Sequence, residues 1–309
     1  MTDIILHNYE ASPFAKKIRA ILGLKKASWS SVEIPRIMPK PDVVALTGGY
    51  RRTPIMQIGA DIYCDTALIS QKLDQIFPEN TLYPNEYLAA AKSMAYWADN
   101  VLFQHTVPVA FQKEVMIQTF GGNVEMMKAF ASDRADMSKN SPRRRILPEE
   151  AHLMFDRFLQ DLDAQLSDGR EYLLGDKPSI ADFSVYHALW FVKSKPIITE
   201  KFIGHNHLLR WMDTIDALGE GNVTVISSSD AIAIAKQSSS QQQLAKNVLS
   251  DFTLGDDVEI LPGDYGFDPV KGKLVFSDEN EFAISRQDER AGDLVVHFPR
   301  LGYDIRTAE

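Results

Sequence analysis

A serine at the start of a predicted helix is the residue best placed for chemistry. Ser12 precedes Pro13, a pair typical of a helix N-cap followed by its first helical residue. A helix N-terminus has unpaired N–H groups that favour negative charge, and a hydroxyl adds one further donor. Ser12 could therefore stabilise an anion such as a thiolate, with Tyr9 as the competing hydroxyl nearby. The alternative is that Ser12 only caps the helix.

A second helix start follows the sequence Cys64-Asp65-Thr66. Asp65 and Thr66 are both good capping residues for a helix expected over residues 67–76. Cys64 ends an apolar strand, and we expect it to be a buried small side chain rather than a redox centre.

No metal or phosphate site is indicated by the remaining candidates. The seven histidines contain no pair with the spacing typical of metal ligands, and His205 and His207 are expected in a solvated loop. Gly48 and Gly49 form a predicted turn, because no helix-starting Lys-Ser/Thr pair follows them as in a phosphate-binding loop.

Composition favours a folded protein of two or three domains. The chain has 309 residues, 45% of them apolar, and no apolar run approaches the ~20 residues that span a bilayer. The N-terminus lacks the pattern of a secretory signal. A single cysteine cannot form an internal disulfide, which favours a reducing, cytoplasmic setting without membrane attachment.

The negative charge is concentrated in the last fifth of the chain. Of a formal net charge of −9, residues 251–309 contribute −8, with 14 acidic and 6 basic side chains. Such a surface repels phosphate backbones, so we do not expect a nucleic-acid partner. The basic run of residues 143–145 is expected to be solvated.

Hydrophobic periodicity divides the chain into three parts. The first has the order β-α-β, a connection, then β-β-α, and makes a small α/β domain. Long helical patterns follow up to residue 218, and the helix over residues 180–193 is apolar nearly all round and therefore buried. The other helices of this part are expected over residues 86–105, 149–166 and 207–218.

The C-terminal part changes character again. Residues 229–249 are rich in Ala, Ser and Gln and are predicted to be a helix or a mobile connector. Short apolar runs between turn signals predict a small β domain, either a curled sheet or a partial barrel. The predicted strands are Val258–Ile260, Lys273–Phe276, Phe282–Ser285 and Leu294–Phe298.

Over residues 3–218 the chain resembles the soluble glutathione transferases. The resemblance is carried by Ser12-Pro13-Phe14 after the first strand, Thr53-Pro54 before the third and Asp65-Thr66 at a helix start. A capping box, Ser179 with Asp182, matches the helical domain of that family and is structural. The resemblance implies a thioredoxin-like α/β domain over residues 1–80 and an all-α domain over 86–220. A β-rich extension over 225–309 lies outside the family pattern.

The resemblance also implies roles for these residues. Ser12 would stabilise the glutathione thiolate, and a cis-Pro54 would let Thr53 pair with the cysteinyl unit like an added strand. Asp65 and Thr66 would hold the amino-acid end of glutathione. Positive charge makes three residues candidates for the glycyl carboxylate: Lys40, Arg51 and Arg52.

The resemblance therefore implies a glutathione-dependent transferase that acts in detoxification as a homodimer. The glutathione thiolate would attack an apolar electrophile or a peroxide held between the domains. No metal is expected to take part. Four aromatic residues could line that pocket, although such residues are more often core: Tyr96, Trp97, Phe103 and Phe111. The alternative is a non-catalytic binding protein on the same scaffold. The extension would then recruit a partner; in an enzyme it could instead be a lid.

Overall fold

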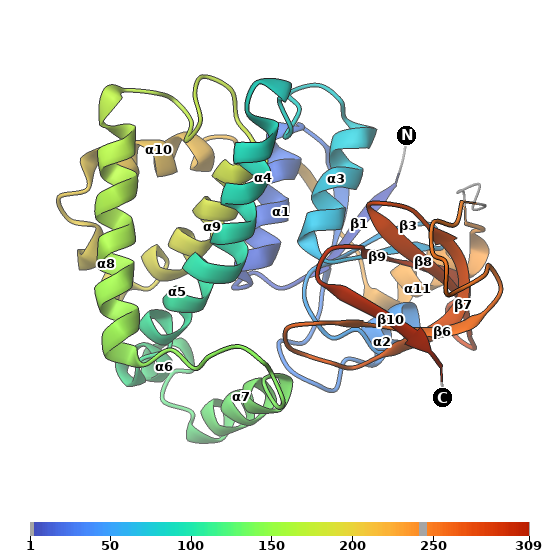
Figure 1. The fold of residues 1–309 in the computed structure, drawn as a ribbon. Helices are drawn as coiled ribbons and strands as arrows, with labels where there is room; N and C mark the ends of the chain where they lie inside the picture. The colour runs from blue at the N-terminus through green and yellow to red at the C-terminus, as the bar shows by residue number, and fades with distance from the viewer. Residues whose placement is uncertain (1–2, 241–245, 309) are drawn as a thin grey trace.

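The computed structural model describes residues 3–240 and 246–308. Figure 1 shows the helical part of the chain on one side of the first helix and the C-terminal strands on the other. Within the described residues, no helix is long and apolar enough to cross a membrane.

The N-terminal part has the predicted order of strands and helices, with one addition. A helix follows the second strand, in a proline-rich segment where none was predicted; Pro41 occupies its first turn, where a proline costs no hydrogen bond. The elements are β1 (Ile4–Asn8), α1 (Pro13–Leu24), β2 (Ser28–Glu33), α2 (Pro41–Thr47), β3 (Ile55–Ile58), β4 (Asp61–Cys64) and α3 (Thr66–Ile76).

The middle part is helical, as predicted. Residues 180–193 form a helix with nearly every side chain buried, which confirms the central helix expected from its uniform apolarity. Two helices between residues 113 and 137 were not predicted, since they expose most of their side chains. The elements are α4 (Leu88–Trp97), a π-helical turn η2 (Ala98–Leu102), α5 (Phe103–Ala110), α6 (Lys113–Thr119), α7 (Val124–Met137), α8 (Pro148–Gln165), α9 (Ile180–Lys193) and α10 (Asn206–Asp216).

The C-terminal part contains the four predicted strands and two more. Residues 228–237 are helical, in agreement with the first of the two alternatives for 229–249, a helix or a mobile connector. Residues 241–245 of that segment lie outside the described residues. The elements are β5 (Asn222–Val225), α11 (Ser228–Gln237), β6 (Asp257–Pro262), β7 (Val270–Ser277), β8 (Glu281–Asp288), β9 (Gly292–Pro299) and β10 (Tyr303–Thr307).

The C-terminal strands continue the N-terminal sheet. Within the described residues, ten strands form one sheet in the order β10-β6-β7-β8-β9-β4-β3-β1-β2-β5. β9 pairs in parallel with β4, and β5 pairs in parallel with β2. The edge of β4 has unpaired N–H and C=O groups that β9 satisfies. Apolar patterning alone predicts the strands of the extension but not this pairing.

Two hydrophobic cores lie on opposite faces of this sheet. Alternate residues of β1 point to opposite faces, so Ile4 and Leu6 enter a core with the helical part while Ile5 enters the other core. The second core joins the N-terminal strands to α2, α11 and the C-terminal strands. Cys64 is fully buried there, and burial raises the pKa of its thiol well above the usual value.

A buried histidine fastens the extension to β4. His297 of β9 is fully buried, with Nε2 3.2 Å from Asp61 Oδ1 and Nδ1 3.4 Å from Glu281 Oε1. Its ring stacks on Tyr63 at a centroid distance of 4.5 Å. Burial by itself would lower the pKa of His297, but interactions with the two carboxylates outweigh it and raise the pKa above 6.5. A charged imidazolium therefore compensates both acids.

We predict that His297→Gln destabilises the protein most at low pH. Because the folded-state pKa is raised, the stabilisation is complete below about pH 6.5 and is lost as the pH rises through the folded-state pKa. A loss of about 2 kcal/mol should lower the Tm by about 5 °C at pH 6. The measurement is calorimetry of both proteins from pH 6 to pH 9, and a pH-independent difference in Tm would contradict the prediction.

Candidate functional site

Ser12 lies where the sequence places it, at the N-cap of α1. Its Oγ accepts a hydrogen bond from the Ala15 N–H at 3.2 Å, and its side chain is 2% exposed. Accepting that bond leaves the hydroxyl proton available for another partner. Tyr9 interacts with Ser12, and its pKa is raised, mainly by burial, so it remains a neutral hydroxyl. The structure thus brings both candidate hydroxyls together.

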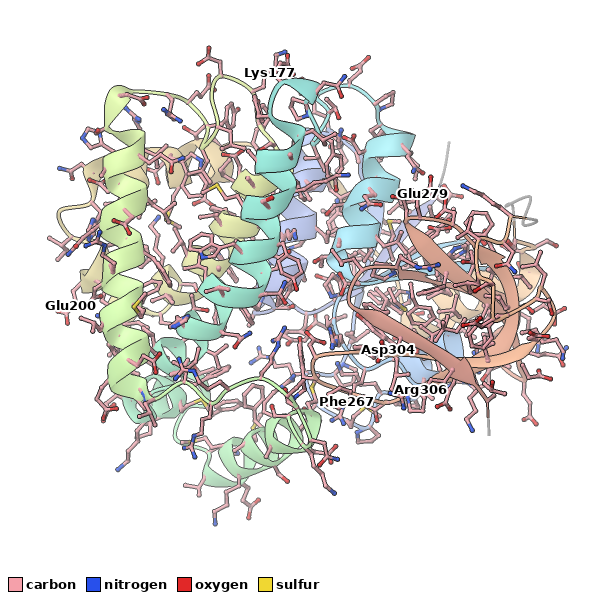
Figure 2. All side chains as sticks on the ribbon, viewed as in Figure 1. Lys177, Glu200, Phe267, Glu279, Asp304 and Arg306 are labelled. Carbon is pink, nitrogen blue, oxygen red and sulfur yellow. The ribbon has the colours of Figure 1, made fainter. Side chains whose placement is uncertain are left out.

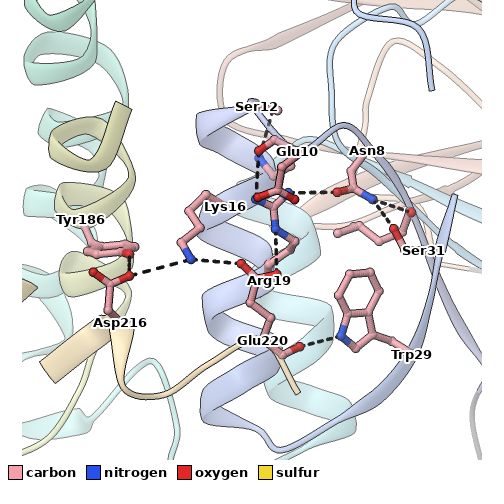
Figure 3. A network of polar contacts seen from close by, with 12 residues as sticks. Asn8, Glu10, Ser12, Lys16, Arg19, Trp29, Ser31, Tyr186, Asp216 and Glu220 are labelled. Atoms are coloured by element: carbon pink, nitrogen blue, oxygen red, sulfur yellow. Dashed lines mark hydrogen bonds and ion pairs between the residues drawn. The ribbon is translucent and has the colours of Figure 1, made fainter. Parts of the chain in front are cut away.

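A polar network holds the start of α1 against β1. Arg19 is almost fully buried and donates from Nη1 to Asn8 Oδ1 at 3.0 Å (Figure 3). Glu220, which follows the helical part, accepts from Lys16 at 3.0 Å and lies 3.2 Å from Arg19 Nε. Its backbone C=O accepts from the Trp29 indole at 2.7 Å. These bonds fix the helix whose N-terminus carries Ser12.

Thr53 and Pro54 are joined by a cis peptide bond, which confirms the geometry implied by the resemblance. Met38–Pro39 is also cis and was not predicted. Among the described residues, no group is hydrogen-bonded to the Thr53 backbone N–H or C=O. An extended peptide could therefore pair with this residue.

Lys40 lies beside Thr53 in a buried position. Its Nζ donates to Thr53 Oγ1 at 3.1 Å and to the Arg51 C=O at 3.2 Å, and only 4% of the residue is exposed. Burial, and then the charge of Arg134, lower the pKa of Lys40 to about 8. No carboxylate lies within 4.0 Å of this ammonium in the part of the chain that the structure describes. Lys40 is therefore well placed to receive a carboxylate.

Asp65 and Thr66 begin α3, as predicted. Asp65 Oδ1 accepts from the Ala67 N–H at 2.9 Å, and Asp65 has a φ of +74°, a conformation rare for residues other than glycine. Strained backbone of this kind is typical of functional sites. The other oxygen, Oδ2, accepts a 3.1 Å hydrogen bond from the Tyr303 hydroxyl of β10. Tyr303 also contacts the Tyr50 hydroxyl at 3.1 Å.

The two candidate arginines already have carboxylate partners. Arg51 forms ion pairs with Asp133 at 2.8 Å and Asp136 at 2.7 Å, both on α7. Arg52 forms an ion pair with Asp264, in the loop between β6 and β7. Of the three cationic candidates, Lys40 is the one without a carboxylate within 4.0 Å among the described residues.

The loop over residues 263–268, here called the bridging loop, connects the extension with both other parts. The Tyr265 ring lies between two guanidinium groups, 3.9 Å from that of Arg52 and 4.8 Å from that of Arg143. Asp264 pairs with the same two arginines. The Gly266 N–H donates to the Met137 C=O at 2.7 Å, and Figure 2 shows Phe267 between α7 and the C-terminal strands.

Sequence reasoning missed the contribution of the extension to this site. Asp264, Tyr265 and Tyr303 are more than 190 positions from the residues that they contact in the N-terminal part. The only available signal was the acidic excess of the tail. It indicated the sign of the charge but not which residue faces a basic partner.

The predicted pocket aromatics lie in different surroundings. Phe103 contacts Phe14 at a centroid distance of 4.7 Å, so it lies beside the start of α1. Phe111 packs on Phe191 at 5.4 Å, Trp97 packs on Phe158, and Tyr96 is 56% exposed. Of the four predicted pocket aromatics, only Phe103 lies next to the Ser12 region.

The capping box of α9 is structural, as expected, with Asp182 Oδ2 accepting from the Ser179 N–H at 2.9 Å. Within the described ranges, no cluster of three or more His, Cys, Asp or Glu side chains could hold a metal ion.

Two family models match the chain, one in its N-terminal part and one in its helical part. A family model for the N-terminal domain of glutathione S-transferases matches residues 6–81, and one for the C-terminal domain matches residues 149–214. Glutathione S-transferase U4 of Arabidopsis thaliana is 25% identical over 109 residues, which are 35% of this chain. That match spans about half of the plant protein, 48% of its length.

Solved structures extend the comparison to the whole chain. A GST-like protein from Pseudomonas syringae is 38% identical, covers 100% of both chains and has a TM-score of 0.83. The extension is therefore shared with that protein. Glutathione S-transferase-I bound with lactoylglutathione is 16% identical, with a TM-score of 0.52 over 70% of this chain and 98% of its own, which shows a common fold.

We predict that Tyr265→Leu loosens the bridging loop. The substitution removes both cation–π contacts, each worth about 0.5 to 2 kcal/mol, so hydrogen exchange in residues 263–268 should become faster while α9 stays protected. The measurement is hydrogen exchange by mass spectrometry. The matched control is Tyr96→Leu, which removes an exposed tyrosine; equal effects of both variants would contradict a specific role for Tyr265.

Proposed function

Because the chain belongs to the glutathione S-transferase family, whose members use glutathione as co-substrate, we propose that it is a glutathione transferase. Its reaction would be the attack of the glutathione thiolate on an electrophilic small molecule, by conjugation or peroxide reduction. The observation that carries the proposal is Ser12, a buried hydroxyl at the N-terminus of α1 that caps the helix and is hydrogen-bonded to the Tyr9 side chain. Conjugation forms a sulfur–carbon bond, and the leaving group departs with its electron pair.

The physical task of the site is to lower the pKa of the glutathione thiol. A free thiol has a pKa near 8.5, so about 3% is thiolate at pH 7. The N–H groups at the start of α1 and the Ser12 hydroxyl both favour the anion. Tyr9 is a neutral hydroxyl beside Ser12 and could provide a second donor. Neither residue takes the thiol proton, which passes to solvent.

We assign the rest of the tripeptide to the neighbouring groups. The free N–H and C=O of Thr53, preceding cis-Pro54, would pair with the cysteinyl unit. Asp65 and Thr66 at the start of α3 would hold the γ-glutamyl end. Lys40 would hold the glycyl carboxylate in preference to Arg52, because Arg52 would first have to release Asp264.

Two contacts support the alternative of a non-catalytic binding protein. Asp65 accepts a hydrogen bond from Tyr303, and Arg52 is paired with Asp264, so the extension contacts one residue assigned to glutathione and one further candidate for its glycyl carboxylate. If glutathione could not compete with these contacts, the fold would be retained without the reaction. The affinity for glutathione separates the two proposals.

We further propose a cytoplasmic detoxification enzyme that acts as a homodimer, as the family resemblance implies. The buried Cys64, with its raised pKa, is consistent with a reducing compartment because it cannot serve as a disulfide partner. Light scattering of the purified chain tests the dimer, and a monomer at micromolar concentration would contradict it.

We predict that Ser12→Ala raises the thiol pKa of bound glutathione by about one unit or more, toward the free value. The measurement is the thiolate absorbance of the bound tripeptide as a function of pH. Ser12→Thr should keep most of the effect because it keeps the hydroxyl. If the thiol pKa of bound glutathione were unchanged in Ser12→Ala but raised in Tyr9→Phe, Tyr9 rather than Ser12 would be the residue that stabilises the thiolate.

We predict that Lys40→Met weakens glutathione binding about tenfold or more, since a hydrogen bond to a charged group contributes about 1.5 to 3 kcal/mol. Calorimetry measures the affinity, and Lys26→Met, at an exposed turn, is the control. If the unaltered protein binds glutathione with a dissociation constant above the millimolar range, the result favours the non-catalytic alternative. Equal affinities of the two variants would contradict the role of Lys40.

A further inference from the structure

The last strand of the extension provides a hydroxyl to the start of α3. Tyr303 is the first residue of β10, and its O–H donates to Asp65 Oδ2 at 3.1 Å. In the register of the sheet Tyr303 lies opposite Pro262, the last residue of β6 before the bridging loop. The contact therefore joins the far end of the extension to a residue that we assign to glutathione.

Three buried aromatic rings fix the position of this hydroxyl. The Tyr303 ring contacts Phe298 of β9 at a centroid distance of 5.9 Å, and Phe298 contacts Tyr50 at 6.0 Å. Tyr303 is 8% exposed, Tyr50 is 2% exposed and Phe298 is fully buried. Close-packed rings of this kind have few alternative positions. The place of the Tyr303 hydroxyl is therefore determined by the sheet of the extension, independently of its bond to Asp65.

The hydrogen bonds of the two tyrosines have one direction. A phenol has a single proton, and Tyr303 donates that proton to Asp65, whose ionised carboxylate can only accept. The Tyr50 hydroxyl, 3.1 Å from that of Tyr303, is therefore the donor in the second bond. Burial, and then the charge of Asp65, raise the pKa of Tyr303 well above its usual value, so the phenol keeps its proton.

Asp65 retains capacity for a cationic group of a ligand. An ionised carboxylate has about four lone-pair sites, and the Ala67 N–H and the Tyr303 O–H use one site on each oxygen. Within residues 3–240 and 246–308, no Lys, Arg or His nitrogen lies within 4.0 Å of this carboxylate. Asp65 is only partly buried. The bond from Tyr303 thus orients the carboxylate without filling it.

Glutathione has one group of the matching charge. The tripeptide has two carboxylates and a single ammonium, which is the α-amino group of its γ-glutamyl unit. A carboxylate that is already held in one orientation loses less conformational entropy when it binds that ammonium. A contact that orients Asp65 in this way strengthens binding, whereas a contact that had to be broken first would weaken it.

We propose that Tyr303 is a positioning residue for glutathione: it holds the Asp65 carboxylate in the orientation that pairs with the α-ammonium. The inference rests on the proposed function for the identity of the ligand and deepens it, because the extension becomes part of the tripeptide site. The hydrogen bond from Tyr303 to Asp65 is kept when glutathione binds. Removing the Tyr303 hydroxyl therefore weakens binding.

The test compares glutathione with glutaryl-cysteinylglycine, the same peptide without its α-amino group. Calorimetry measures the dissociation constants of both peptides with the unaltered protein and with Tyr303→Phe, which keeps the ring. We expect Tyr303→Phe to weaken glutathione about fivefold or more and to leave the analogue within about twofold. The unchanged affinity for the analogue also shows that the variant is folded. Tighter binding of glutathione by Tyr303→Phe would identify a blocking contact and overturn the inference.

Two further variants show whether the effect passes through Asp65. When Asp65→Asn is already present, adding Tyr303→Phe should change the glutathione affinity by less than about twofold. A second loss as large as the first overturns the inference.

The matched control is Tyr50→Phe, which removes a buried hydroxyl from the same aromatic cluster and leaves the bond from Tyr303 to Asp65. It should keep the glutathione affinity within about twofold. A loss equal to that of Tyr303→Phe would show that the packing of the cluster, and not the bond to Asp65, determines the affinity.

The thiol pKa of bound glutathione separates this inference from the proposed function. If glutathione binding depends on Tyr303 but the bound thiol keeps its free pKa, the inference stands and the transferase proposal fails. If the thiol pKa is lowered and Tyr303→Phe binds both peptides like the unaltered protein, the transferase stands and the inference is overturned. Absence of glutathione binding to both proteins overturns both.

Discussion

The pairing of β9 with β4 is the interaction on which the arrangement of the site depends. Three residue pairs join these parallel strands, and the buried His297–Asp61 contact adds charge to the hydrogen bonds of the sheet. Because β9 is fixed at this edge, the strands beyond it form the outer part of the same sheet. The bridging loop and Tyr303 are thereby brought to the side of the N-terminal domain where we propose that glutathione binds.

The extension contacts only part of the proposed glutathione site. Tyr303 contacts Asp65 and Asp264 contacts Arg52, whereas no hydrogen bond or ion pair joins Ser12 or Lys40 to a described residue of the extension. Residues proposed for the thiol and for one carboxylate therefore stay available. This division favours a role in shaping the site over a role in blocking it, since a blocking segment would occupy the thiol position first.

Local signals in the sequence predicted most of the first 220 residues. Ser12 with Pro13 and Asp65 with Thr66 are capping patterns that specify helix starts, and the uniform apolarity of residues 180–193 specifies a buried helix. Each of these signals comes from neighbouring residues, so a single sequence contains it. The cis geometry of Pro54 came from the family resemblance, because a proline alone does not specify its isomer.

The contribution of the extension could not be predicted in the same way. Strand patterns revealed β6 to β9, but an unpaired edge accepts any strand of suitable length, so patterning does not specify that β9 meets β4. The same limit applies to Arg52, whose charge suggested a ligand carboxylate. The structure instead pairs it with Asp264, since the nearest acid in space is more than 200 residues away in the chain.

The distribution of paired and unpaired cations links the fold to the proposed glutathione site. The extension and α7 supply the carboxylates that neutralise Arg51, Arg52 and Arg143, and these pairs hold the parts of the chain together. Lys40 has no carboxylate within 4.0 Å among the described residues and remains available for the carboxylate of glutathione that we propose it binds. Lys40 is buried without such a partner, and the cost of burying its charge would be reduced by a bound carboxylate.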